Sequence, residues 1–242
     1  MKRFLFFTII FSFIFSSLFS QECVRIYGQV TDFKGIPIDS VSIRLKNKAF
    51  TNLYETLSDK EGKFSMVVEK GNYYCLYAIK LSDYKKTKLE YWAWNVPAYK
   101  DLEINPQYNN MEIYGINAFE MQVTPQESYR IYFRPMSLIK GGNSPINEGD
   151  TVNMSPETIS TEELSVKVNG IKAKIVTINK VTEYARGIYL FGYEIQIIKP
   201  TQTPSALKEN ERIPGFDKIT IVLDSKETGE IGKGEAFVRL IE

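Results

Sequence analysis

The feature that most constrains the fold is a strict alternation of apolar and polar residues over short runs, with no helical repeat of useful length. Apolar residues recur at every second position in residues 24–30, 41–45 and 64–68. A period of two places successive side chains on opposite faces of an extended strand, so that one face can be buried. Tyr and Phe, at 15 residues each, also favour strands over helices. The chain is therefore predicted to be all-β.

Two similar turns punctuate the first of these runs. Asp32 precedes Gly35 by three residues and Pro37 follows, and Asp59 and Gly62 repeat the same spacing. An Asp side chain accepts hydrogen bonds from nearby backbone N–H groups, and Gly takes a positive φ without steric cost. Pro37 keeps the connection out of a strand ladder. Both stretches are predicted to be hairpin turns.

The order of GQVTDFKGIPIDSVSI, TLSDKEGKF and EKGNYYCLYA resembles the carboxypeptidase regulatory-like domain. The resemblance covers roughly residues 24–80 and implies a prealbumin-like (transthyretin-like) seven-stranded sandwich. It further implies a non-catalytic accessory module, of the kind found beside metallocarboxypeptidase domains and in bacterial outer-membrane receptors and surface proteins. The peptidase of that family is a separate domain with zinc-binding His residues, so the resemblance implies no peptidase activity here.

The second half continues the strand pattern without that resemblance. LSVKVNGIKAKIVTI is predicted to be a hairpin with Asn169 and Gly170 at its tip, because Asn-Gly is the strongest short-range turn signal. About seven strands are expected, which suggests an immunoglobulin-like sandwich by pattern alone. The polar stretch 124–128 is predicted to be a linker. The expected domains are two β-sandwiches, residues 21–123 and 128–242.

Residues 1–20 have the basic start, apolar run and small terminal residues of a secretory signal peptide, with cleavage expected after Ser20. The mature chain is expected to be exported to a bacterial periplasm, the cell surface or the medium, with no later transmembrane segment. Cys23 offers a second interpretation, a lipid anchor, although the preceding Glu22 is unlike the small residue that normally stands before a lipidated Cys.

Charge and residue usage limit the chemistry. Removing residues 1–20 takes away two basic residues and no acidic one, so the formal net charge changes from +1 to −1. No global attraction to nucleic acid or anionic membranes is therefore expected. The absence of His excludes Ser-His-Asp and Cys-His catalysis and His-ligated zinc, and two Cys cannot form a four-Cys site. Carboxylate-pair or Ser-Lys chemistry stays open, but no spacing points to it, and no cofactor or metal is predicted.

Both tryptophans lie in the segment YWAWN. On a strand, Trp92 and Trp94 point the same way, and with Tyr91 they could form a platform on which sugar rings stack. The alternative, which the general burial of large aromatics favours, is that they pack in a core. The predicted function is thus a non-catalytic binding or structural protein with an unknown protein or glycan partner at the cell envelope, and a glycan-binding protein is the alternative.

Three other features have an ordinary interpretation beside a functional one. Cys23 and Cys75 are expected to form a disulfide if the chain is exported, and otherwise to be two thiols, one buried and one exposed. Residues 199–216 form a loop of unusual length, which suits a mobile segment as well as a binding one. The acidic stretch 147–150 could offer oxygens to calcium but lacks the ligand spacing of a calcium loop, which favours a solvated turn.

Overall fold

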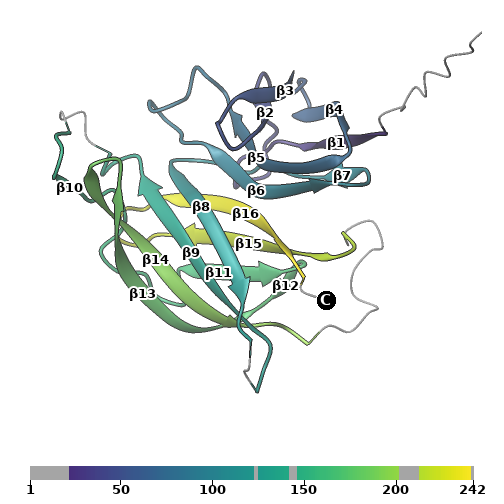
Figure 1. The fold of residues 1–242 in the computed structure, drawn as a ribbon. Coiled ribbons are helices and arrows are strands. Elements are labelled where there is room, and N and C mark those ends of the chain that lie inside the picture. The colour runs from purple at the N-terminus through teal and green to yellow at the C-terminus, as the bar shows by residue number, and fades with distance from the viewer. Residues whose placement is uncertain (1–21, 123–124, 142–145, 202–212, 241–242) are drawn as a thin grey trace, which may run out of the picture.

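The computed structural model describes residues 22–122, 125–141, 146–201 and 213–240, and every helix-or-strand element within them is a strand (Figure 1). The all-β fold class is therefore confirmed. A helix able to cross a membrane is absent from those ranges. The predicted signal peptide, residues 1–20, lies outside the described residues.

The strands of the described chain form three sheets. The smallest has the order β4 (Lys63–Glu69), β1 (Cys23–Gln29) and β7 (Leu102–Glu103). The largest has eight strands in the order β12 (Ile171–Lys172), β11 (Leu164–Val168), β15 (Phe216–Asp224), β16 (Ile231–Arg239), β6 (Tyr91–Ala98), β5 (Gly71–Ile79), β2 (Ser42–Lys46) and β3 (Asn52–Leu57). The third has the order β10 (Thr151–Val152), β14 (Ile188–Ile198), β9 (Ser128–Ser137) and β8 (Met111–Glu120), with β13 (Lys174–Ala185) also paired to β14.

Local sequence explains why the strands form where they do. In β4 the apolar Phe64, Met66 and Val68 are buried, and the residues between them are exposed. The turn before β4 is closed by Asp59, whose Oδ1 accepts hydrogen bonds from the N–H groups of residues 61 and 63. Gly62 completes that turn at a φ of 72°.

The first turn is built in the same way. Asp32 Oδ1 accepts hydrogen bonds from the N–H groups of Lys34 and Ile36, at 2.8 and 2.9 Å. Gly35 lies at a φ of 80°, in the left-handed region that glycine adopts without strain.

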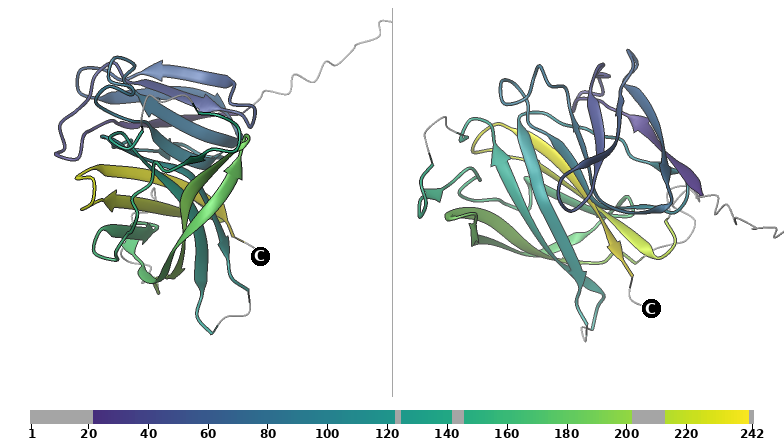
Figure 2. Two further views of the ribbon diagram at one scale, coloured as in Figure 1. Left: turned by 90° about the vertical axis from the view of Figure 1, so that its left-hand side faces the viewer. Right: turned by 45° about the horizontal axis from the view of Figure 1, so that its top comes forward.

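The two smaller sheets cover opposite faces of the large sheet at opposite ends (Figures 1 and 2). The three-stranded sheet packs on the β6–β5–β2–β3 end and makes the first sandwich. The five-stranded sheet packs through β8 on β16, β15 and the opposite face of β6, and makes the second. At each end of the large sheet, therefore, one face carries a small sheet and the other face does not.

The halves of the chain meet in a single ladder. β6 pairs in parallel with β16, with Trp92 opposite Gly234 and Trp94 opposite Ala236. The eight-stranded sheet thus runs without a break through both sandwiches, and the buried side chains of both form one continuous cluster.

The domain division predicted at residues 123–128 stays a prediction, as do the prealbumin-like and immunoglobulin-like names for the halves. What the structure adds is that this segment joins β8 to β9, two strands that pair antiparallel in the five-stranded sheet.

Candidate functional site

Two glycines on β16 fix the position of β8. A Cβ atom on Gly232 would lie 2.4 Å from the main-chain oxygen of Met111, and one on Gly234 would lie 2.7 Å from that of Ile113. β8 can approach this closely only because the glycines carry no side chain. Since side chains alternate along a strand, Glu235 points to the other face, which the five-stranded sheet does not cover.

A cleft of about 350 Å³ lies on that other face, between β7 and the outer surface of β11, β15 and β16. The strands β7 and β15, which carry lining residues of the cleft, are labelled in Figure 1. Its wall and its floor both carry polar and charged side chains, among them Glu103, Asn105 and Gln107 on the wall and Lys167, Lys218 and Glu235 on the floor. The cleft therefore belongs to neither sandwich alone.

Glu235 is the buried acid at the floor. Its carboxylate accepts hydrogen bonds from Tyr91 Oη at 2.7 Å and Thr220 Oγ1 at 3.2 Å, and Lys233 Nζ lies 3.2 Å away. Burial by itself would raise the pKa of Glu235, but the ammonium groups of Lys233 and Lys218, with the hydrogen bonds, outweigh it and hold the pKa at about 2. Glu235 is therefore a fixed negative charge that orients the lysines around it.

The lysines make the cleft electropositive. Lys218 and Lys233 lie within ion-pair distance of Glu235, and Lys233 also donates to the main-chain oxygen of Asn105 at 3.0 Å. Lys167 is exposed, and no described side chain forms an ion pair or hydrogen bond with its ammonium group. Three ammonium groups thus face two carboxylates, those of Glu103 and Glu235.

The predicted hairpin tip contributes one side of this cleft. Asn169 and Gly170 have φ values of 50° and 82°, the two positive values of a type I′ turn. The Asn169 side chain accepts a hydrogen bond from Lys218 N at 2.8 Å and donates one to Asp217 Oδ1 at 2.6 Å. The sequence predicted only a turn at these residues, and it did not show that hydrogen bonds of Asn169 hold this turn beside the cleft.

The chemistry that this arrangement offers is recognition. Ammonium groups and amide side chains can bind carboxylates, sulfates or hydroxyl groups of a ligand. In the described ranges no group of three or more Cys, Asp and Glu residues lies together as a metal site. The sequence contained one signal for the floor: Glu235 stands directly before the apolar AFV run of its strand, and a charge beside a buried run needs a partner.

The predicted sugar platform of Tyr91, Trp92 and Trp94 is wrong. The indoles of Trp92 and Trp94 do stack, with centroids 5.3 Å apart and planes at 17°, but they are only 6% and 5% exposed. Tyr114 of β8 packs edge-on against both rings, and Phe50 packs against them from the β2–β3 loop. Tyr91 is fully buried on the opposite face of β6. These rings are core because β6 lies inside a sheet that is covered on both faces.

A buried acid lies at the edge of that aromatic cluster. Trp92 Nε1 donates to Glu112 Oε1 at 2.6 Å. Burial raises the pKa of Glu112 well above its ordinary value, and the neighbouring carboxyl of Glu90 raises it further. Trp94 Nε1, by contrast, is buried without a hydrogen-bond partner among the described residues. The cluster is closed to solvent and holds the sandwiches together.

The two cysteines differ in their exposure to solvent. Cys75 is fully buried on β5 and Cys23 is exposed at the start of β1, and the structure has them as two thiols and not as a disulfide. Cys23 lies in register with Glu69 at the end of the three-stranded sheet, whereas Cys75 lies in register with Trp94 inside the large sheet. Burial raises the pKa of the Cys75 thiol to about 12.

One of the two predicted loops lies partly outside the described residues. Within 199–216, residues 202–212 are not described. The acidic stretch 147–150 forms a turn in which Asp150 Oδ2 accepts a hydrogen bond from Asn147 N at 2.7 Å, as expected for a solvated turn.

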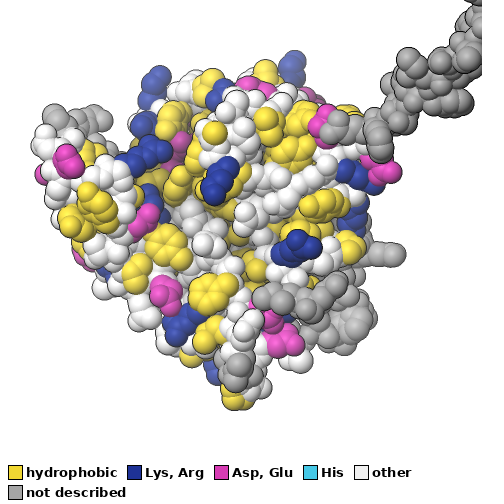
Figure 3. Space-filling view, viewed as in Figure 1, with side chains coloured by type: hydrophobic (Ala, Val, Ile, Leu, Met, Phe, Trp, Pro, Cys, Tyr) yellow, Lys and Arg dark blue, Asp and Glu magenta, His cyan; other side chains and the backbone are white. Residues whose placement is uncertain are grey.

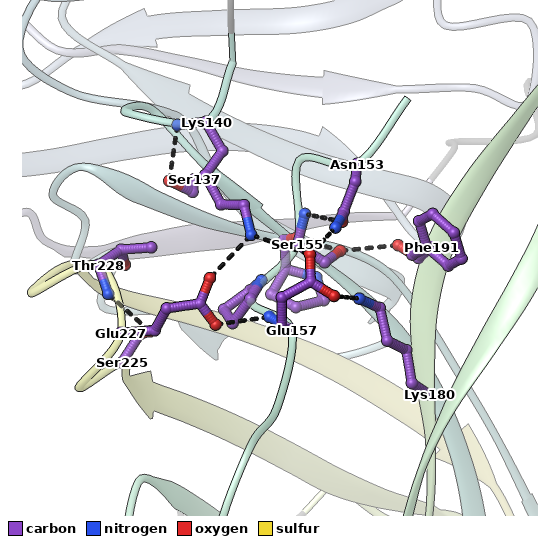
Figure 4. A network of polar contacts seen from close by, with 12 residues as sticks. Ser137, Lys140, Asn153, Ser155, Glu157, Lys180, Phe191, Ser225, Glu227 and Thr228 are labelled. Carbon is purple, nitrogen blue, oxygen red and sulfur yellow. Dashed lines mark hydrogen bonds and ion pairs between the residues drawn. The ribbon is translucent and has the colours of Figure 1, made fainter. Parts of the chain in front are cut away.

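A network of polar contacts on the second sandwich holds its segments together and does not form a binding site (Figure 4). Ser155 Oγ lies within hydrogen-bond distance of the main-chain oxygens of Pro135 and Phe191, at 2.8 and 2.7 Å. Glu157 is paired with Lys180 at 2.7 Å, and Lys140 is paired with Glu227 at 2.8 Å. These contacts fix the segment after β10 to the five-stranded sheet and to the β15–β16 turn, which leaves the cleft as the better candidate.

No protein-family model matches this sequence, and a search of curated proteins found no match either. Among solved structures the chain is similar to the major pilin subunit of Bacillus cereus, with 13% identity over 90% of this chain and 69% of that chain and a TM-score of 0.28. It is also similar to a DUF3823 family protein from Parabacteroides merdae, with 10% identity over 90% of this chain and 98% of that chain and a TM-score of 0.27. At these TM-scores the likeness carries no argument about function.

Proposed function

We propose that this chain is an exported, non-catalytic protein of the bacterial cell envelope, in which two fused sandwiches present a ligand-binding cleft at their junction. The observation that carries the proposal is the cleft of about 350 Å³ whose floor and wall come from different sandwiches. Export rests on the signal-peptide pattern of residues 1–20 and is part of the proposal.

The continuous sheet supports a rigid binding unit. A cleft between domains that move relative to each other changes shape, and ligand pockets are mostly preformed. Here the β6–β16 ladder and the Trp92–Trp94 cluster join the two sandwiches directly. The wall of the cleft is therefore held at a fixed distance from its floor.

The surface supports a polar ligand. On the face shown in Figure 3, hydrophobic side chains lie in separate groups and not in one continuous field. Large continuous apolar patches mark many protein-binding surfaces. The cleft instead offers ammonium and amide groups, which suit a ligand with oxygen acceptors.

The proposal is tested by co-sedimentation of the purified chain, from residue 21 onward, with isolated bacterial cell envelopes. Lys167→Glu reverses a charge on the cleft floor that has no described partner, so it should reduce binding without changing the melting temperature. Lys48→Glu is the matched control, because Lys48 is an exposed lysine on the β2–β3 loop, outside the cleft. If the envelopes do not retain the wild-type chain, or if both variants bind like wild type, the cleft is not the binding site.

A further inference from the structure

A second hollow continues the cleft and differs from it in character. It has a volume of about 210 Å³, and its aromatic lining residues are Tyr99, Phe216 and the almost fully buried Phe237. Tyr99 follows β6 and Phe216 begins β15, and their rings stack with centroids 6.1 Å apart and planes at 26°. Tyr99 is 49% exposed. The half-exposed ring of Tyr99 therefore lies beside the partly exposed ring of Phe216 at the junction of the sandwiches.

Three polar side chains surround these rings and have no described partner. Asn72, Asn95 and Arg239 all line the hollow and are exposed, and none of their side chains forms a hydrogen bond or ion pair with the described residues. Asn95 also has a φ of 55°, a left-handed conformation that is uncommon for a residue other than glycine. Flat rings bordered by unused amide and guanidinium groups are what a sugar ring needs for stacking and hydrogen bonding.

A second pair of exposed aromatic rings has a different geometry. Tyr184 and Tyr189 lie at the tip of the β13–β14 hairpin with centroids 5.1 Å apart, but their planes meet at 54°. Such a tilted pair offers no common flat face. The two tyrosines therefore serve as a comparison for the stacked pair.

The hollow and the cleft lie one after the other along the same face of β15 and β16, and together they are called the groove. Along β15 and β16 the outward positions are the register pairs Val222–Lys233, Thr220–Glu235, Lys218–Phe237 and Phe216–Arg239. The first two pairs and Lys218 line the cleft, and Phe237 and the last pair line the hollow. At about 3.3 Å for each residue, the six steps from Val222 to Phe216 span roughly 20 Å, so the groove suits an extended chain molecule.

The charges that line the groove indicate which class of chain molecule it binds. Four cationic side chains line the groove, those of Lys167, Lys218, Lys233 and Arg239, and two carboxylates, those of Glu103 and Glu235, face them. The excess of positive charge is complementary to an acidic ligand. We propose that the groove binds an acidic polysaccharide, with a pyranose ring stacked on Tyr99 and Phe216 and uronate carboxylates paired with the lysines. This inference rests on the proposed function of the cleft and names its ligand class.

The experiment measures binding of a galacturonate hexasaccharide to the purified chain from residue 21 onward, by calorimetry and by NMR of labelled protein. Tyr99→Ala should weaken binding about tenfold, because it removes the exposed ring of the stack. Tyr99→Phe keeps the ring and should keep the affinity. Arg239→Gln should weaken binding about tenfold through loss of a charge-assisted contact. Tyr184→Ala is the matched control and should bind like wild type.

The outcomes separate this inference from the proposed function. If cell envelopes retain the chain but the hexagalacturonate does not bind, the ligand class is wrong and the cleft proposal stands. Equal binding of a neutral xylohexaose, or of a thymidine hexanucleotide, would likewise overturn an acidic glycan as the specific ligand. Loss of binding in Tyr184→Ala, or full binding in Tyr99→Ala, would place the glycan outside the groove.

Discussion

Replacing the buried acid of the cleft gives the sharpest test of the electrostatics. In the folded chain the pKa of Glu235 is about 2, against an ordinary value of 4.5. A carboxyl whose pKa is lowered on folding stabilises the folded state above its unfolded pKa, and this contribution is lost as the pH falls toward the folded pKa. The contribution of Glu235 should therefore be complete above pH about 5 and should disappear between pH about 4.5 and about 2.

The magnitude follows from the same values. At about 1.4 kcal/mol for each pKa unit, the lowered pKa of Glu235 corresponds to about 3 kcal/mol of unfolding free energy at neutral pH. Glu235→Gln keeps the shape and a hydrogen-bond acceptor for Tyr91 Oη but removes the charge that faces Lys233 and Lys218. The variant should thus be less stable than wild type by about 3 kcal/mol at pH 7 and nearly equal to it near pH 2.

Urea unfolding at several pH values measures this difference directly. Glu103→Gln is the matched control, because Glu103 is an exposed acid on the wall of the same cleft. The gap between wild type and Glu235→Gln should close as the pH falls, and the gap for Glu103→Gln should stay below about 1 kcal/mol throughout. A gap of constant size for Glu235→Gln would refute the electrostatic account and indicate a packing defect.

Three further results are expected. Burial, and then the carboxyl of Glu90, raises the pKa of Glu112, so the contribution of Glu112 to stability is present below pH 4.5 and is lost as the pH rises above that value. The unfolding free energy of Glu112→Gln should therefore rise relative to that of wild type between pH 5 and 8, and urea melts without such a rise would contradict this. Gly62→Val should lower the unfolding free energy by more than about 1 kcal/mol, because Gly62 has a φ of 72° and a Cβ there would lie 2.4 Å from a main-chain oxygen. A Cβ on Gly71 meets no atom within 4 Å, so Gly71→Ala should cost at most about 1 kcal/mol in a thermal melt. Iodoacetamide at pH 8 should alkylate Cys23 in the native protein and Cys75 only after unfolding. If mass spectrometry of the unreduced, unfolded chain finds neither cysteine alkylated, the two cysteines form a disulfide after all.

Local sequence was sufficient to predict the strands that have a clear apolar and polar alternation, such as β4. Alternation in residues 64–68 predicts β4 because one face of that strand is buried and the other is not, and the rule depends on no distant residue. The same rule places Trp92 and Trp94 on one face of β6, where their indoles stack. It cannot tell which strand covers that face, and Tyr114 of β8 covers it.

The candidate site depends on long-range pairing, so local patterns could not predict it. The cleft exists because β16 joins β6 and carries Glu235 to the phenol of Tyr91, 144 residues away. No short stretch encodes that contact. The aromatic pair of the groove is hidden from sequence analysis for the same reason, since Tyr99 and Phe216 come from different halves of the chain.

The place of β16 also bears on how the chain acquires its structure. β16 is the last strand of the described chain, yet it lies in the middle of the large sheet, between β15 and β6. Contacts between residues so distant in sequence slow folding, because a long loop must close before they form. Until β16 arrives, β6 is an open edge of a half-built sheet, and such edges pair readily with other chains. A chain that stops before residue 231 should therefore aggregate through β6, whereas a chain that includes β16 covers that edge.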